Sequence, residues 1–188
     1  KGKAMRIVGI IDRTGYVFRP RGMTARHLAT LVQDKQKGIA LDRAAGGCPA
    51  SALEAVNFMA AHALTRPVLV DVASGDTAPA LASAVAHGMD LVLANKAPLA
   101  SRRNEARKIL QESREHGRRV LHEATVGAGL PIIDTLQQLH ASGDRVASLH
   151  SSPSGTLRFL FRDLGPGRPF SGVVRPPAAR GYPGPAPA

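Results

Sequence analysis

The chain has 188 residues, a formal net charge of +11 and a hydrophobic share of 44%, which suits a packed core and excludes a disordered chain. No apolar run reaches the roughly 18 residues that a membrane helix needs. The basic N-terminal stretch is followed by too short an apolar run for a signal peptide. The chain has a single cysteine, which excludes an internal disulfide. The composition therefore predicts a globular protein of a reducing compartment, the cytoplasm, without membrane association.

The positive charge is spread along the chain and does not gather into one cluster. The longest basic runs are pairs, such as Arg102–Arg103 and Arg118–Arg119, and aromatic residues make up only 4% of the chain. A nucleic-acid interface needs a clustered basic footprint or aromatic stacking platforms. The sequence therefore argues against nucleic-acid binding and favours an arginine-rich but ordinary surface.

Apolar runs rich in β-branched residues alternate with amphipathic stretches along most of the chain. Buried strands are predicted at Met5–Ile11, Val68–Val72, Leu91–Leu93 and Val120–His122. Helices are predicted over 25–36, 51–64, 76–89, 102–118 and 130–144, and a loop over 13–23. Such alternation predicts an α/β fold with a doubly wound parallel (Rossmann-like) sheet and crossover helices.

The last part of the chain changes character. Residues 145–164 are predicted to hold a strand and then a helix, and the final 13 residues contain five prolines. Because proline removes a backbone donor and fixes its own φ, no helix interior tolerates that density. We therefore expect an extended or disordered tail.

The strand ends are where ligands bind in an open parallel sheet. The first predicted strand ends in Asp12–Arg13. At this place in dinucleotide-binding folds, an acid hydrogen-bonds the ribose hydroxyls, whereas an arginine accommodates a 2′-phosphate. The pair leaves NAD and NADP open, and a solvated charged turn is the simpler alternative.

The second and third strand ends also carry residues suited to a ligand. In the stretch DVASGD, Ser74 and Gly75 can bring backbone donors to a ligand where the next helix begins. Lys96 directly follows the third strand and can act as a fixed positive charge or as a proton donor. The alternatives are an ordinary strand-to-helix turn and a surface lysine.

The fourth strand leads into the stretch HEATVGAGLP. Gly127 and Gly129 permit left-handed or closely approached backbone. Glu123 with nearby carbonyl oxygens could hold a hard cation. The alternative is a tight turn with Pro131 in the first helical turn.

Taken together, the motifs resemble those of homoserine dehydrogenase. The segments VDVASGD, LVLANKAPLA, HEATVGAGLPIIDTL, SGDRV, SGTLRFL and RPFSGVV occur in that family's order and spacing, from about Arg6 to about Pro185. The resemblance implies an NAD(P)-dependent oxidoreductase that interconverts L-homoserine and L-aspartate 4-semialdehyde in threonine and methionine biosynthesis. It also implies a homodimer as the usual assembly.

The resemblance assigns roles to individual residues. Lys96 matches the active-site lysine near cofactor and substrate. The resemblance assigns cofactor contacts to Ala73, Ser74, Lys96 and Gly181, and the strand-end argument adds Arg13 to them. A monovalent cation, usually sodium, is assigned to Glu123 and to the backbone oxygens of Val126, Ala128 and Leu130. Residues 1–121 are then a partial NAD(P)-binding domain, and residues 122–188 the start of an α+β substrate and dimerisation domain with the proline-rich tail.

Three departures from the family pattern bear on activity. The family opens with a strand and a Gly-x-Gly-x-x-Gly loop, which this sequence does not contain, and Pro183–Gly184 stand where the family has Thr-Glu. The family's later aspartate and lysine have no counterpart here. We therefore expect an interior fragment that is inactive by itself. The alternative is a non-catalytic remnant or a partial domain that binds another subunit.

Overall fold

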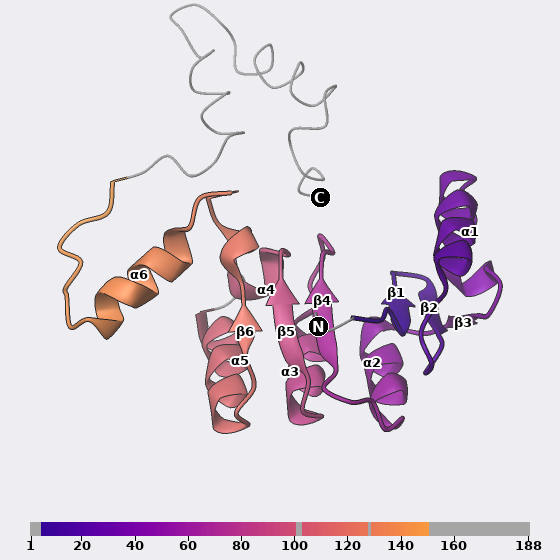
Figure 1. Ribbon diagram of the computed structural model, residues 1–188, viewed down its shortest axis with the longest axis horizontal. Coiled ribbons are helices and arrows are strands. Elements are labelled where there is room, and N and C mark those ends of the chain that lie inside the picture. The colour runs from indigo at the N-terminus through magenta and orange to yellow at the C-terminus, as the bar shows by residue number, and fades with distance from the viewer. Residues whose placement is uncertain (1–4, 101–102, 128, 151–188) are drawn as a thin grey trace, which may run out of the picture. The chain divides into compact units, whose positions relative to one another are not determined.

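A computed structural model describes residues 5–100, 103–127 and 129–150 (Figure 1). The predicted helix near residue 160 and the proline-rich tail lie outside these residues. The described chain contains two three-stranded sheets, with strand orders β1-β2-β3 and β4-β5-β6. It divides into two compact units, Lys1–Val92 with Ala97–Val120, and Leu93–Lys96 with Leu121–Ala188.

The second sheet is the parallel one. It consists of β4 (Val68–Asp71), β5 (Asp90–Leu93) and β6 (Val120–Leu121), whose arrows point the same way in Figure 1. The crossovers contain α3 (Ala78–Ala86), then α4 (Ala97–Ala100) and α5 (Arg103–Glu115). The predicted α/β class with a parallel sheet is therefore confirmed.

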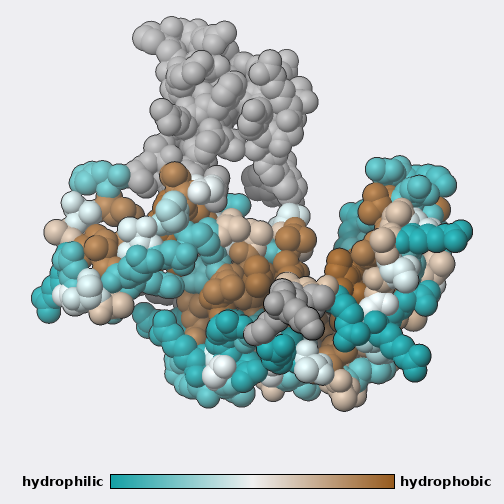
Figure 2. All heavy atoms as spheres, in the orientation of Figure 1, coloured by the Kyte–Doolittle hydropathy of each residue, from teal (hydrophilic) through white to brown (hydrophobic). Residues whose placement is uncertain are grey.

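The two faces of this sheet differ in burial. On β5, Leu91 and Leu93 are buried, and so are Leu81 on α3 and Ile109 on α5, two helices that pack on each other. On β4, by contrast, alternate valines are exposed, and Figure 2 shows hydrophobic surface over β4 and β5. The face of the sheet that carries the exposed valines is therefore apolar but not buried within the described unit. Parallel sheets are normally covered on both faces.

The first sheet is an antiparallel hairpin with a third strand. β1 (Gly9–Ile11) pairs with β2 (Gly15–Phe18), which pairs with β3 (Gly47–Pro49). Val17 of β2 is buried with Leu31 of α1 (Ala25–Gln36), Leu41 of η1 (Leu41–Arg43) and Ala44. This small core fixes the hairpin and therefore the turn between β1 and β2.

Two predictions about this region are wrong. Met5–Ile11 is not a buried strand of the parallel sheet, because only Gly9–Ile11 is a strand, it pairs antiparallel, and Met5 is 81% exposed. Residues 13–23 are not all loop, because β2 lies within them. The physical reason is the turn at Asp12, whose carboxylate accepts two backbone N–H groups and reverses the chain.

Side-chain caps confirm the predicted starts of the first two α-helices. Thr24 accepts the N–H of His27 at the start of α1. Ser51 and Glu54 form a reciprocal capping box at the start of α2 (Ala52–Ala60), which packs on α3 and β2. Among the described residues, no helix has the length and apolar composition required to cross a bilayer.

The described part of the second unit is small. Besides residues 93–96 it contains η2 (Glu123–Thr125) and α6 (Ile132–Ala141), which contact each other. Residues 145–150 form no regular strand. The unit therefore holds the stretch that follows β5 and the glycine-containing stretch that follows β6.

Candidate functional site

Asp12 organises the turn that follows β1. Its Oδ1 accepts hydrogen bonds from the Thr14 N–H (2.7 Å), the Thr14 hydroxyl (2.7 Å) and the Gly15 N–H (3.3 Å). Its Oδ2 accepts from the ammonium group of Lys35 on α1. Asp12, which the sequence suggested as a ribose ligand, therefore already accepts hydrogen bonds from its own turn and from α1.

These contacts change the acidity of Asp12. Partial burial opposes its ionisation, but the hydrogen bonds from Lys35 and Thr14 outweigh burial and lower the pKa of the carboxyl from 3.8 to about 2. The side chain is 21% exposed, so solvent screens the interactions only in part. Asp12 therefore remains a carboxylate at every physiological pH.

We expect this carboxylate to make the stability of the chain acid-sensitive. Because the folded pKa lies below the unfolded value, the contribution is complete above pH 4 and is lost as the pH falls toward 2. Two pKa units correspond to on the order of 2 kcal/mol. In urea unfolding, Asp12→Asn should lower the free energy of unfolding most near pH 6. The difference in free energy of unfolding between this variant and the wild type should shrink below about pH 4. A difference that does not change with pH would contradict this.

Arg13 lies beside Asp12 and is exposed. Among the described residues, no hydrogen bond or ion pair holds its guanidinium group. It is therefore the group of this turn that is available to a ligand.

The turn after β4 is ordered by Asp71, a residue that sequence reasoning did not assign. Asp71 is only 6% exposed, and its carboxylate accepts from the Ala73 N–H (3.0 Å) and from the Thr77 hydroxyl (2.5 Å). Ala73 and Ser74, the two predicted cofactor contacts, are exposed on this turn. An aspartate at a strand end, two residues before a small-residue turn, was the available signal.

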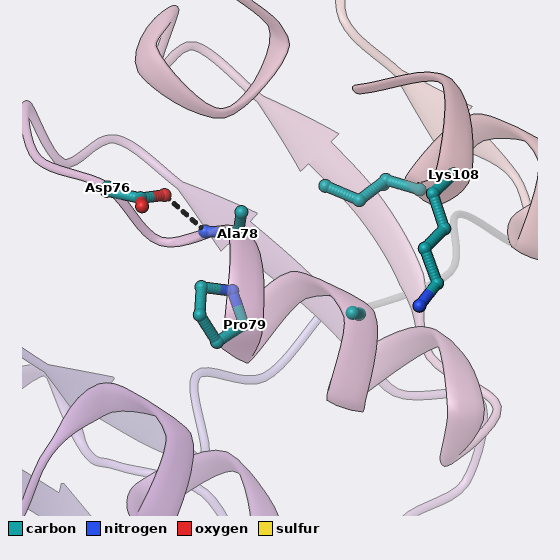
Figure 3. A pocket seen from close by; sticks show the side chains of 6 residues that line it. Asp76, Ala78, Pro79 and Lys108 are labelled. Carbon is teal, nitrogen blue, oxygen red and sulfur yellow. Dashed lines mark hydrogen bonds between the residues drawn. The ribbon is translucent and has the colours of Figure 1, made fainter. Parts of the chain in front are cut away.

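A pocket lies between the start of α3 and α5 and contains none of the predicted site residues. Its lining includes Asp76, Ala78 and Pro79 on one side and Lys108 on the other (Figure 3). The Ala78 N–H donates to Asp76 Oδ1 (3.0 Å). The pocket holds about 210 Å³, below the roughly 300–1,000 Å³ of drug-sized ligand sites, so it is too small for a dinucleotide.

Lys96 stands between β5 and α4. It is exposed, whereas the preceding Asn95 is only 3% exposed. Within the described residues, no hydrogen bond or ion pair holds the ammonium group of Lys96. Its side chain therefore contributes little to packing, and its role toward a ligand stays a prediction.

Glu123 caps α6. Its Oε1 accepts from the Ile133 N–H and its Oε2 from the Asp134 N–H, both at 2.9 Å. Partial burial opposes ionisation, but these backbone donors outweigh it and hold the pKa of the carboxyl below its usual range. Sequence spacing did not indicate this role, because the donors lie ten and eleven residues further along the chain.

The two glycines of this stretch differ. Gly127 has φ +73°, a backbone conformation that favours glycine, and a Cβ there would lie 2.2 Å from Cδ1 at the end of the Ile132 side chain. Gly129 has no positive φ, and a Cβ there would meet nothing within 4 Å. The predicted left-handed conformation is therefore confirmed for Gly127 alone.

The predicted site residues fall into both units. Arg13, Ala73 and Ser74 belong to the first, and Lys96, Glu123, Val126 and Leu130 to the second. Ala128 and Gly181 lie outside the described residues. Among the described side chains, no group of three or more His, Cys, Asp or Glu could hold a metal ion, so any cation there would depend on backbone carbonyls.

A parallel sheet with crossover helices and polar turns at its strand ends is typical of a dinucleotide-binding α/β domain. The family model for the homoserine dehydrogenase NAD-binding domain matches residues 5–123. The chain belongs to the homoserine dehydrogenase family, and residues 5–123 are part of its NAD-binding domain.

Curated relatives agree with this assignment. Homoserine dehydrogenase of Paracoccidioides brasiliensis is 40% identical over 109 residues, which are 57% of this chain and 29% of that protein. Bifunctional aspartokinase/homoserine dehydrogenase 2 of Escherichia coli is 39% identical over 118 residues, which are 62% of this chain and 15% of that protein. The chain thus spans less than a third of either relative.

Solved structures share the fold. Homoserine dehydrogenase from Thermoplasma acidophilum superposes with a TM-score of 0.64 at 19% identity, covering 94% of this chain and 52% of that chain. A hyperthermophilic archaeal homoserine dehydrogenase in complex with NADPH superposes with a TM-score of 0.67 at 20% identity. The match covers 93% of this chain and 51% of that chain. At such identities the likeness concerns the fold alone.

Proposed function

We propose that this chain supplies the NAD(P)-binding part of an enzyme that interconverts L-homoserine and L-aspartate 4-semialdehyde. The match of residues 5–123 to the family's NAD-binding domain carries the proposal. The exposed Ala73–Ser74 turn, held by Asp71 at the end of a parallel strand, fits the backbone contacts that a dinucleotide needs. The structure of a relative that holds NADPH supports the same cofactor class.

The proposed roles follow from the chemistry of each residue. NAD(P) supplies hydride transfer to and from the substrate carbon. Ala73 and Ser74 bind and orient the cofactor through their backbone. Lys96 holds a positive charge at the substrate oxygen or moves a proton to it, since its ammonium group is exposed. Gly181 is proposed as a further cofactor contact.

We also propose a sodium or other monovalent cation site at Glu123 and the backbone oxygens of Val126, Ala128 and Leu130. Each Glu123 oxygen accepts one backbone N–H, so each keeps acceptor capacity. The donor set contains only oxygens, which suits a hard cation.

We further propose that the protein forms a homodimer and is located in the cytoplasm. We propose that residues 1–121 form one domain and residues 122–188 the start of a second.

A chimera tests the function. In it, residues 5–123 replace the aligned segment of the Paracoccidioides brasiliensis enzyme. We expect the chimera to oxidise NAD(P)H with aspartate semialdehyde, because the host supplies the remaining segments. The 188-residue chain by itself should show no turnover, because its sequence has no Gly-x-Gly-x-x-Gly loop for the pyrophosphate and has Pro183–Gly184 in place of Thr-Glu. The measurement is NAD(P)H absorbance.

Each outcome decides between the candidates. A folded chimera without activity, checked by circular dichroism and thermal melting, would favour the alternative of a non-catalytic remnant or subunit-binding domain. Turnover by the chain alone, above that of its Lys96→Ala variant, would show that the chain retains more of the enzyme than we propose.

A further inference from the structure

We propose that His62 and His87 hold a divalent transition-metal ion such as Zn²⁺ in a pocket between the ends of α2 and α3. The pocket has a volume of about 230 Å³, and its lining also includes Ala60, Pro67 and Met89. Pro67 and Met89 directly precede β4 and β5. The pocket therefore lies at the edge of the parallel sheet opposite to the strand ends of the proposed cofactor site, and the inference does not depend on that site.

The first observation is the hydrogen bond of the His62 ring. Its Nδ1 lies 2.9 Å from the carbonyl oxygen of Phe58, four residues earlier in the chain. Because a carbonyl oxygen can only accept, Nδ1 carries a proton, and in the neutral ring Nε2 then has the lone pair. A backbone carbonyl that holds one ring nitrogen in this way is the usual arrangement around a metal-binding histidine.

The ring of His62 is also fixed by packing. Its centroid lies 4.7 Å from that of Phe18 and 4.9 Å from that of Phe58. In the turn that follows α2, the Leu64 N–H donates to the His62 carbonyl oxygen (2.6 Å). A side chain whose rotamer is already restricted loses little entropy when it binds an ion.

His87 supplies the second imidazole. It is the C-cap residue of α3 and is exposed, and among the described residues no hydrogen bond or ion pair holds its ring. It can therefore turn toward His62 without breaking a contact. The two helices pack on each other, and the Ser83 hydroxyl of α3 donates to the Asn57 side chain of α2. The backbones that carry the two histidines are thus held together.

The surroundings favour a transition metal over Mg²⁺. Both helices end at the pocket, and the carbonyl ends of helices attract cations. Arg118 opposes this attraction, because its guanidinium group donates to the carbonyl oxygen of Gly88 (3.2 Å), a residue of the pocket lining. Zn²⁺ binds well to the lone pairs of neutral imidazoles, whereas Mg²⁺ requires oxygen ligands.

Two imidazoles do not complete the coordination of Zn²⁺, which takes about four ligands in proteins. Among the described residues, no further histidine, cysteine or carboxylate joins them. The remaining positions therefore belong to water or to carbonyl oxygens of the helix ends.

The test measures Zn²⁺ binding to the untagged 188-residue chain by competition with a zinc indicator dye, with Mg²⁺ as the control ion. We expect saturable Zn²⁺ binding and a higher melting temperature with Zn²⁺, because an ion that binds only the folded chain stabilises it. His62→Phe keeps a ring without nitrogen, and His87→Ala truncates an exposed side chain. Each should weaken Zn²⁺ binding at least about tenfold, the smallest usual effect of losing even a supporting residue of a metal site.

His116→Ala is the matched control. Nδ1 of His116 lies 2.8 Å from the carbonyl oxygen of Glu112, the same kind of contact that His62 makes, but His116 is exposed and does not line the pocket. This variant should bind Zn²⁺ as the wild type does. Circular dichroism checks that each variant folds, and if His62→Phe does not, His87→Ala decides alone.

Several results would overturn the inference. Equal losses in all three variants would mean that scattered surface imidazoles bind the ion. A loss in only one of two folded pocket variants would mean that a single histidine binds it. The absence of saturable Zn²⁺ binding, or equally tight binding of Mg²⁺, would show that the pocket is no transition-metal site.

Discussion

Replacing Gly15 by alanine is expected to destabilise the chain by about 3 kcal/mol or more, a large part of the roughly 5–15 kcal/mol of a typical domain. A Cβ at Gly15 would lie 2.1 Å from the carbonyl oxygen of Cys48 and 3.1 Å from Asp42 Cβ. The close atom is backbone in β3, which is paired to β2, so it cannot move without breaking that pairing. Urea unfolding followed by circular dichroism measures the effect.

Gly75→Ala is the matched control for this substitution. Gly75 has no positive φ, and a Cβ there would meet nothing within 4 Å. We expect a change within about 1 kcal/mol, with a gain possible because alanine restricts the unfolded chain. Equal effects of the two substitutions would mean that the packing of β2 against β3 is looser than the contacts indicate.

The helix starts could be predicted from the sequence, but the hairpin of β1 and β2 could not. Local signals predicted the helix starts well, because Thr24, Ser51 and Glu54 act on donors three residues away. The stretch after Asp12 reads as a loop because glycine and proline punctuate it. Its strand pairs with β1 on one side and, on the other, with Gly47–Pro49, thirty or more residues further on, and strand pairing follows from such partners more than from propensity.

Some features of the candidate site could likewise be predicted from the sequence, and others could not. Residue type and position at strand ends suggested Arg13, Ser74 and Lys96, and the family resemblance added Ala73; the roles of these residues stay predictions. The structural roles of Asp12 and Glu123 could not be read in advance, because they depend on donors from Lys35 and from the start of α6. Asp71 was missed although its partners are local, because a buried acid and a solvated one look alike in a sequence.

The second large effect concerns Lys96 in the chimera described above. We expect Lys96→Ala to lower kcat/KM by about 10²–10⁴, the usual worth of a positioned proton donor. The melting temperature should stay the same, because Lys96 is exposed and, among the described residues, no hydrogen bond or ion pair holds its ammonium group. Lys37→Ala, which removes an exposed lysine at the end of α1, is the matched control and should leave the rate unchanged.

Lys96→Arg separates the two roles that the strand-end position allows. Arginine keeps the positive charge but does not give up its proton at any physiological pH. If Lys96 acts as a fixed charge, Lys96→Arg should recover a large part of the rate lost in Lys96→Ala. If it moves a proton, both variants should be slow, and the rising or falling limb of the pH–rate profile that belongs to Lys96 should disappear in both. A chimera that is as fast with Lys96→Ala as without it would make Lys96 an ordinary surface residue.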